Sequence, residues 1–405
     1  MAVPSLSLME FMERPGVTEL AWGHPDPRFL PGRALRAAAD RVIRRYGPDA
    51  LGYGRPAGPP PLIEMIRSRL GEIDARSPAP DEVVITAGSS QGLDQIATLL
   101  MDPGDVALVE APTYHLAIKL LRDHPLKLVA VPSDRSGLRI DALAEAITRV
   151  RADGDRPRIL YTVPTFNNPT GLSLSGRRRR ELVALAEREG ILVVEDDAYR
   201  ELAYDGPPPP SLWSMARPGT VIRLGTFSKS IAPGLRVGYM TGDAATIAKF
   251  VDGGLLDSGG GIGHFTGLMV AEYFRVGGYA RDVERLRVAY RKRRDRMLGA
   301  LERHMPKGTR WTKPAGGYFI WVTLPPGHDT RVLQPIALEK GIGFAHGRTF
   351  FGDARGGETS LRLAFSRYPP ATLEAAVRQL RSGLAEHGPP RRSARKKQHD
   401  TDDAK

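Results

Sequence analysis

The chain lacks cysteine, and this absence limits the chemistry open to it. With no Cys among 405 residues, disulfide frameworks and thiolate-bound metals are excluded. The nine His are scattered along the chain, and no two of them have the spacing of metal ligands. We therefore expect no metal site.

The chain also lacks a long apolar run. No uninterrupted apolar stretch could span a bilayer, and residues 1–13 have neither the basic start nor the apolar core of a signal peptide. Hydrophobic residues still make up 41% of the chain, which is enough for a large core. These observations predict a soluble, cytoplasmic protein without a membrane partner.

Acidic residues are fewer than basic ones, at 46 against 58, which gives a net charge of +12. Residues 389–405 contribute six basic and three acidic side chains to this excess, and their composition predicts a disordered basic tail. Elsewhere the basic residues do not gather into one stripe with interleaved aromatics. A nucleic-acid partner is therefore not expected.

Short β-branched runs alternate with helix-like segments between about residues 80 and 240. Several of the runs are nearly all apolar, which is typical of strands buried on both faces. The alternation predicts an α/β fold with a mostly parallel, doubly wound sheet. The last two strands have no room for a helix between them, so we expect an antiparallel edge pair. The predicted strands are Val83–Ala87, Val106–Glu110, Leu128–Val131, Ile159–Val163, Ile191–Glu195, Val221–Gly225 and Arg236–Met240.

The pattern changes after about residue 280. A long charged amphipathic segment, Arg281–His304, predicts a helix, and two strands and two helices follow it. This order predicts a smaller α+β domain. We assign 45–280 to a large domain, 1–44 and 281–388 to the small domain, and 389–405 to the tail.

Lys229 lies in the loop between the last two strands of the large domain. A nucleophilic Lys must be partly neutral, and no acidic residue near it in sequence would hold its charge. The hydroxyls of Thr226 and Ser228 suit phosphate oxygens, and Arg236 could add a forked donor to the same phosphate. The alternative is an ordinary polar loop with a solvated Lys.

Ser89 and Ser90 stand where a predicted strand gives way to a predicted helix. Free backbone N–H groups and the helix dipole make such a turn an anion site, to which two hydroxyls would contribute. A Gly-Ser turn is also a common helix cap, so the pattern alone leaves both readings open.

Polar side chains follow two further strands. Asp196 ends one of them, where a carboxylate could pair with a pyridinium nitrogen, and Tyr199 lies three residues on. Asn168 precedes a Pro, which holds its backbone extended and fixes its amide. A capping Asp and a plain turn at the Asn are the alternatives.

At this point the chain resembles the class I/II aminotransferases of PLP (pyridoxal 5′-phosphate) fold-type I, closest to the branch of 2-aminoadipate and kynurenine aminotransferases. The resemblance covers about residues 15–385. It rests on a Gly-Ser pair at 88–89, Glu-Ala-Pro-Thr-Tyr at 110–114, Asn-Asn-Pro-Thr-Gly at 167–171, Asp-Asp-Ala-Tyr at 196–199, Ser-Lys at 228–229 and Leu-Arg-Leu-Ala-Phe-Ser at 361–366.

The resemblance implies a role for each matched position. Lys229 would form the Schiff base with PLP and then move the proton as general base and acid. Asp196 would pair with the pyridinium, Asn168 and Tyr199 with the ring oxygen, and Tyr114 would stack on the ring. The phosphate ligands would be Ser89, Ser90, Thr226, Ser228 and Arg236.

The resemblance also implies how the substrate and a second subunit are bound. Arg362 would grip the α-carboxylate, and Gly23 would lie at the substrate mouth. Tyr53 would reach the phosphate in the neighbouring subunit, which implies a homodimer with shared active sites. The chain departs from the pattern at His24, at His346 and in the glycine-rich stretch 252–263.

The leading functional prediction is transfer of the α-amino group of an amino acid to a 2-oxo acid. An alternative keeps PLP but predicts elimination, replacement, racemisation or carbon–carbon bond formation, because the first proton abstraction is common to all of these. A PLP-domain transcription regulator is a third alternative, which we do not favour because only about twenty residues precede the first matched segment.

Overall fold

The computed structural model describes residues 14–352 and 354–387. The predicted tail and residues 1–13, on which the signal-peptide argument rests, lie outside the described residues. No helix within the described ranges is both long and apolar enough to cross a membrane.

An eight-stranded sheet forms the larger part of the fold, with the strand order β2-β9-β8-β7-β6-β3-β4-β5. Neighbours from β8 through β4 pair in parallel. The predicted mostly parallel α/β sheet is therefore confirmed, although it has one strand more than the seven predicted, because the short β5 pairs with the end of β4. Its strands are β2 (Val83–Thr86), β3 (Val106–Ala111), β4 (Lys127–Asp134), β5 (Gly137–Leu138), β6 (Pro157–Thr162), β7 (Leu192–Asp196), β8 (Val221–Thr226) and β9 (Gly238–Thr241).

The last two predicted strands do pair antiparallel, but not at the edge. β9 lies between β8 and β2 and runs antiparallel to both, so β2 is the edge strand. The predicted edge position was wrong because the sequence spacing reports the short connection from β8 to β9. Nothing in that spacing indicates that β2, which comes much earlier in the chain, pairs with the other side of β9.

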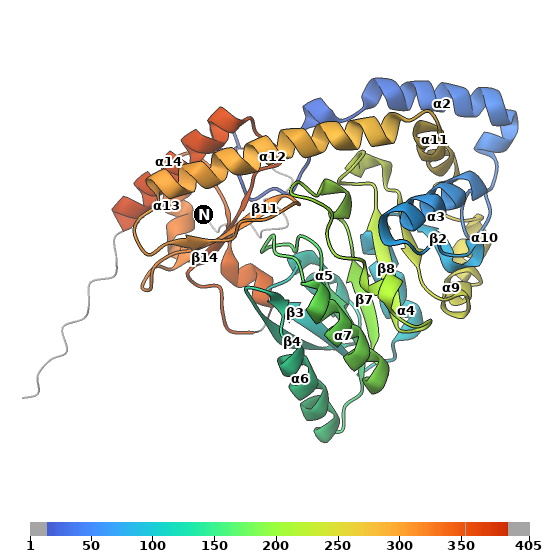
Figure 1. The fold of residues 1–405 in the computed structure, drawn as a ribbon, viewed down its shortest axis with the longest axis horizontal. Helices are drawn as coiled ribbons and strands as arrows, with labels where there is room; N and C mark the ends of the chain where they lie inside the picture. Colours follow the sequence, from blue (N-terminus) through green and yellow to red (C-terminus); the bar gives the residue numbers. More distant parts are fainter. Residues whose placement is uncertain (1–13, 353, 388–405) are drawn as a thin grey trace, which may run out of the picture.

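Helices cover both faces of this sheet (Figure 1). Successive residues of β3 show why its sequence is apolar throughout: Leu108 packs with α6 and α7, whereas Val109 packs with α4 and α5. The helices of this part are α3 (Pro60–Asp74), α4 (Ser89–Leu100), α5 (His115–Arg122), α6 (Ile140–Ala152), α7 (Gly176–Glu189), α8 (Leu212–Met215), α9 (Ala244–Val251), α10 (Gly254–Gly259) and α11 (His264–Arg275).

The C-terminal part is built on a four-stranded antiparallel sheet with the order β10-β11-β14-β13. The long helix α12 crosses to it from the end of α11 (Figure 1) and shares its core with α13 and α14. The elements are α12 (Gly278–His304), β10 (Arg310–Trp311), β11 (Phe319–Thr323), α13 (Thr330–Glu339), β13 (Ala345–His346), β14 (Ser360–Ala364) and α14 (Pro370–His387).

The N-terminal residues contact both parts. β1 (Thr18–Glu19) pairs in parallel with β12 (Ile342–Gly343), next to the four-stranded sheet. Helix α2 (Gly32–Tyr46) instead packs Ala38 and Val42 into a core shared with α3 and α11. The domain boundaries stay a prediction.

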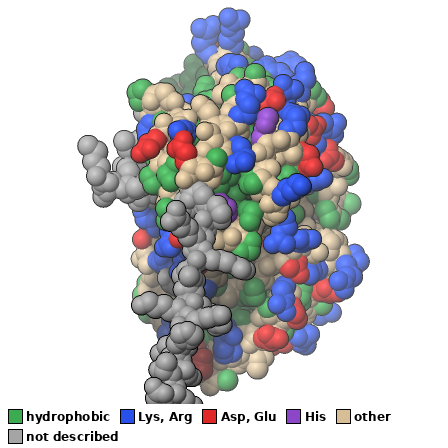
Figure 2. Space-filling model, turned by 90° about the vertical axis from the view of Figure 1, so that its left-hand side faces the viewer, with side chains coloured by type: hydrophobic (Ala, Val, Ile, Leu, Met, Phe, Trp, Pro, Cys, Tyr) green, Lys and Arg blue, Asp and Glu red, His purple; other side chains and the backbone are tan. Residues whose placement is uncertain are grey.

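Figure 2 shows how charged side chains are distributed over one face of the molecule. On the face drawn in Figure 2, Lys and Arg side chains are interspersed with Asp and Glu and with hydrophobic residues. This distribution is compatible with the expectation of a solvated surface rather than one continuous basic stripe on that face.

Candidate active site

Polar residues meet where the parallel strands end. Because β3, β6, β7 and β8 run in the same direction, their C-terminal ends share one edge of the sheet, where open α/β folds bind ligands. Tyr114 follows β3, Asn168 follows β6, Asp196 ends β7 and Thr226 ends β8. A cavity of about 230 Å³ opens among them.

This cavity, called here the lysine cavity, brings together nearly every residue predicted for the site. Tyr53 is the one predicted residue outside its lining, and its side chain is 89% exposed. The predicted residues that line it are Gly23, Ser89, Ser90, Tyr114, Asn168, Asp196, Tyr199, Thr226, Ser228, Lys229, Arg236 and Arg362.

The Lys229 amine is held inside the lysine cavity. Its Nζ donates a hydrogen bond to the Gly23 carbonyl oxygen at 3.0 Å, and it lies 5.9 Å from the ring centres of Tyr199 and Tyr318. The Tyr318 hydroxyl also donates to the Lys229 carbonyl oxygen at 3.0 Å. Both the amine and the backbone of this loop residue are therefore fixed.

Asp196 presents one carboxylate oxygen to a buried partner and leaves the other without one. Its Oδ2 accepts a hydrogen bond from the Tyr161 hydroxyl at 2.7 Å, whereas Oδ1 is buried with no hydrogen-bond partner among the described residues. Burial raises the pKa of Asp196 to about 6, although the bond from Tyr161 acts in the opposite direction. A cationic donor facing Oδ1 would satisfy this oxygen and stabilise the charge.

The opposite end of the lysine cavity suits an anion. Ser89 opens α4, so its turn presents free backbone N–H groups at the positive end of the helix dipole. Arg236 reaches over this turn and donates to the Ala87 carbonyl oxygen at 2.9 Å. Gly88 is favoured here, because its φ of +84° is a backbone conformation that residues with a Cβ rarely adopt. Thr226 and Ser228 add hydroxyls 3.0 Å apart.

A buried arginine lies across the lysine cavity from the strand ends. Arg362, on β14, is 1% exposed and donates from Nη1 to the Asn168 side-chain oxygen at 2.6 Å. Its guanidinium carbon lies 4.2 Å from the ring centre of Phe319. A planar fork held on an aromatic face is well suited to a carboxylate.

Sequence reasoning missed two polar side chains of the site. Tyr161 fell within the predicted strand Ile159–Val163 and was given no role, since its contact to Asp196 depends on the pairing of β6 with β7. His24 lines the lysine cavity, but it was noted only as a departure from the family pattern. Burial, together with the charge of Lys229, lowers the pKa of His24 to about 4, so this imidazole is neutral near pH 7.

The other two departures lie elsewhere. His346 is not part of the lysine cavity and sits 3.3 Å from the Thr349 hydroxyl. The glycine-rich stretch 252–263 contains the short helix α10. A Cβ at Gly261 would lie 2.2 Å from the Arg55 carbonyl oxygen, so glycine lets this stretch approach the segment after Tyr53.

These residues fit PLP. The free Oδ1 of Asp196 suits a protonated ring nitrogen, the Lys229 amine an aldehyde, and the α4 turn with Arg236 a phosphate. Asp196 and the α4 turn are attached to different strands of one sheet, so a rigid planar group can contact both at once.

A buried chain of charges supports this site from behind. Arg223 of β8 bridges Asp74 and Asp197 at 2.6 and 2.5 Å, and Asp74 also pairs with Arg200 at 2.8 Å. Although burial acts to raise it, these two guanidinium groups hold the pKa of Asp74 below its usual value. The chain anchors the residue next to Asp196.

Replacing Arg223 with Met is expected to lower the free energy of unfolding by about 3–5 kcal/mol, because the buried Asp197 loses its ion-pair partner and the buried Asp74 keeps only Arg200. Thermal or urea unfolding of the purified protein measures this loss. The control is Arg217→Met, since the 84% exposed Arg217 side chain lies 3.6 Å from Glu187 and its loss should cost at most about 1 kcal/mol. Equal effects of the two variants would show that the buried chain is not a stabilising unit.

Comparison with known proteins agrees with the geometry. The sequence profile described as "Aminotransferase class I and II" matches residues 17–380. The chain is 36% identical to a 2-aminoadipate transaminase of Thermus thermophilus, over 93% of this chain and 92% of the relative. It is 33% identical to aromatic-amino-acid aminotransferase 1 of Thermococcus litoralis, over 94% and 90%.

Solved structures show the same fold. A Pyrococcus horikoshii kynurenine aminotransferase in complex with PMP superposes with a TM-score of 0.88 at 34% identity and covers 95% of both chains. The α-aminoadipate aminotransferase LysN of Thermus thermophilus, complexed with N-(5′-phosphopyridoxyl)-L-leucine, has a TM-score of 0.84 at 35% identity, again over 95% of both chains. The chain thus belongs to the class I and II aminotransferase family and is a PLP-dependent aminotransferase of fold-type I.

Proposed function

We propose that the lysine cavity carries out amino transfer from an amino acid to a 2-oxo acid, with Lys229 as the catalytic base and acid. One observation supports this above the others: Lys229, Arg362 and Asp196, whose Oδ1 has no hydrogen-bond partner among the described residues, all line one cavity. PLP, when bound, supplies an aldehyde and an electron-withdrawing ring.

Each residue has a separate task in this proposal. Lys229 takes the proton from the substrate α-carbon and returns it on the cofactor side. Asp196, held by Tyr161, stays charged opposite the ring nitrogen. Tyr114 packs on the ring face, and Asn168 and Tyr199 bind the ring oxygen. Ser89, Ser90, Thr226, Ser228 and Arg236 hold the phosphate.

Arg362 binds the α-carboxylate next to Gly23. In the structure its fork is engaged by Asn168 and by the Ala21 carbonyl oxygen at 2.5 Å, so the carboxylate replaces existing bonds rather than filling an empty position. The exchange keeps the buried guanidinium hydrogen-bonded before and after substrate binding, so its charge is not left unpaired.

The experiment that tests the function is a half-reaction. Purified protein with PLP is mixed with single amino acids, and absorbance follows loss of the aldehyde form and gain of the amine form. Mass spectrometry then identifies the 2-oxo acid. If no amino acid in a broad panel produces the amine form, or if the product retains its α-amino group, the proposal is wrong.

We further propose a homodimer in which Tyr53 reaches the partner's cofactor phosphate. Tyr53 and Leu51 are 89% and 72% exposed in the single chain, and the glycine-rich stretch packs directly behind them. Large apolar side chains exposed close together are common where a second subunit packs. Light scattering gives the mass in solution, and a monomer would contradict this proposal.

Replacing Arg362 with Leu is expected to lower kcat/KM for amino acids at least about 100-fold, since two charge-assisted hydrogen bonds contribute about 1.5–3 kcal/mol each. PLP affinity should stay close to that of the wild type. The matched control Arg362→Lys keeps the positive charge but lacks the forked guanidinium. Its kcat/KM should lie between those of the wild type and Arg362→Leu. Loss of PLP affinity with an unchanged kcat/KM would assign Arg362 to the cofactor instead.

Affinity for PLP is expected to fall as the pH drops below about 6. The free protein binds a proton at Asp196 with a pKa of about 6, and the positive ring nitrogen favours the charged carboxylate, so binding expels that proton. Below about pH 6 the free energy needed to release the proton from Asp196 opposes PLP binding. Above about pH 6 Asp196 is already charged, so the affinity should level off. Equilibrium dialysis across this range measures the slope, which Asp196→Asn should remove. A flat wild-type profile would contradict the assignment.

A further inference from the structure

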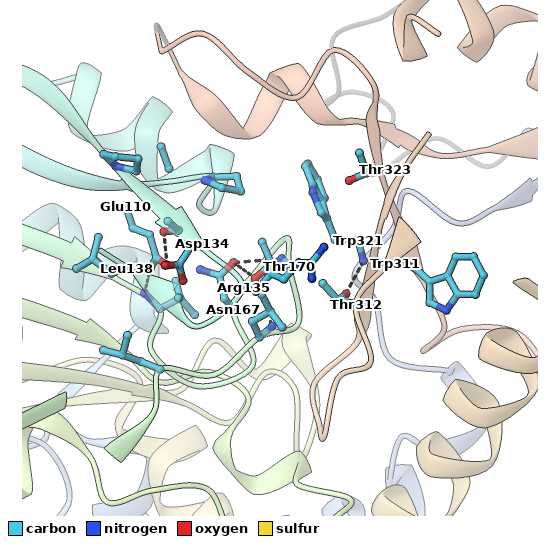
Figure 3. Close-up of a pocket in the computed structure, with 18 of the residues that line it drawn as sticks. Glu110, Asp134, Arg135, Leu138, Asn167, Thr170, Trp311, Thr312, Trp321 and Thr323 are labelled. Atoms are coloured by element: carbon cyan, nitrogen blue, oxygen red, sulfur yellow. Dashed lines mark hydrogen bonds between the residues drawn. The ribbon is translucent and has the colours of Figure 1, made fainter. Parts of the chain in front are cut away.

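A second and larger cavity separates the two sheets of the molecule. It measures about 1020 Å³, against about 230 Å³ for the lysine cavity. One wall is formed by the ends of β3 and β4, the turn to β5 and the segment that follows β6; the other is formed by β10 and β11 (Figure 3). We call it the intersheet cleft.

The intersheet cleft is distinct from the proposed site of amino transfer. Val163 is the one residue that lines both cavities. Lys229, Asp196 and Arg362 do not line the cleft, so the chemistry proposed above does not account for it. Its size and shape need another explanation.

The acidic side chains of the cleft wall on the β4 side are already satisfied. Glu110 is 5% exposed and accepts hydrogen bonds from Thr162 at 2.7 Å and from Ser133 at 3.0 Å. Burial raises the pKa of Glu110, which favours its neutral form. Asp134 pairs with Arg178 at 2.7 Å. Neither acid is left to attract a cation.

The basic side chains of the cleft are not satisfied in this way. Arg135 comes from the turn between β4 and β5, and Arg310 and Lys313 come from β10 and the residues after it. No carboxylate among the described residues lies within ion-pair distance of any of the three. The cleft holds one further acid, Glu302, and all four of these charged side chains are exposed at its rim. Positive charge is therefore in excess, and it comes from both walls.

Flat apolar groups complete the lining. The indole of Trp321 of β11 lies between the two walls (Figure 3), and Phe351 and Leu138 belong to the same lining. An indole face partly open to a cavity favours stacking with an aromatic ring. Asn167, which is 3% exposed, adds a buried amide to the opposite wall.

From this charge and shape we propose that the intersheet cleft binds a small molecule that joins an aromatic ring to an acidic group. The ring stacks on Trp321, and the acidic group lies among Arg135, Arg310 and Lys313. Such a molecule contacts both walls at once. Asn167 of this wall precedes Asn168, which accepts a hydrogen bond from Arg362 in the lysine cavity.

The test uses 8-anilinonaphthalene-1-sulfonate, an aromatic sulfonate that fluoresces in apolar surroundings. The protein is the PLP-loaded enzyme in whichever oligomeric state it is purified. Titration of the wild type is compared with the double variant Arg310→Glu/Lys313→Glu. The matched control is Lys292→Glu/Arg381→Glu, which makes the same charge change at exposed positions of α12 and α14. A third protein, Trp321→Ala, removes the stacking face.

We expect saturable binding to the wild type and to the control. Binding to Arg310→Glu/Lys313→Glu should be at least about tenfold weaker, since each reversal removes an attraction and adds a repulsion, and binding to Trp321→Ala should be weaker because the stacking face is lost. Wild type that does not bind, or binding unchanged in the double variant, would overturn the proposal. Binding that an excess of a 2-oxo acid displaces in full would place the probe in the lysine cavity and also overturn it. A failure of amino transfer itself would appear in the half-reaction without any probe.

Discussion

Replacing Lys229 with Ala is expected to lower the rate of amino transfer by about 10³-fold or more, with PLP still bound. A positioned acid–base group contributes about 10²- to 10⁴-fold, and the same amine also makes the covalent bond to the aldehyde. Single-turnover absorbance measures the rate. Borohydride reduction followed by mass spectrometry should label Lys229 with a pyridoxyl group in the wild type and leave the variant unlabelled.

The comparison for this variant is Lys249→Ala, which truncates an exposed lysine on α9. It should keep the wild-type rate and the label at Lys229. A small added amine should restore part of the rate of Lys229→Ala, because the cavity left by the side chain lies where the proton must move. Full turnover in Lys229→Ala without any amine would remove the base and acid role from this residue.

Replacing Asp196 with Asn is expected to cost about 2–5 kcal/mol of transition-state stabilisation, or about 30- to 3000-fold in kcat, because a buried charge pair with the ring nitrogen is lost. The amide keeps the size of the side chain, so folding should be preserved. Steady-state kinetics at saturating PLP separate this loss from weaker cofactor binding.

Tyr161→Phe is the informative companion to Asp196→Asn. It removes the donor to Oδ2 but keeps the carboxylate, so its effect should be about tenfold or less. If Tyr161→Phe lowers kcat as much as Asp196→Asn, the charge at position 196 is not the important quantity. The phenol would then have to act directly.

The sequence predicted the parts of the site that depend on local order. Lys229 with its hydroxyl neighbours, the turn before α4 and the acid at the end of β7 each follow a strand, and parallel strands bring such residues to one edge. Twelve residues could therefore be placed in one site from short motifs and a family resemblance. Their exact partners could not, since each bond crosses between elements.

The predictions that failed or were missing have the same origin. The position of β9 inside the sheet depends on β2, which lies far away in sequence. Tyr161 reaches Asp196 only because β6 and β7 pair in one register. The intersheet cleft has walls from segments almost 200 residues apart, so no local pattern could indicate it. His24 was visible, but its neutral state follows from burial that the sequence does not show.

The buried chain of charges has a consequence for protein engineering. Its members come from the end of α3, from β8 and from the residues after β7, so a chimaera that exchanges only one of these segments with a relative would break the chain. Asp74, Asp197, Arg200 and Arg223 should therefore be inherited together. Library designs that recombine homologues would do best to treat these four positions as one block and to place crossovers outside it.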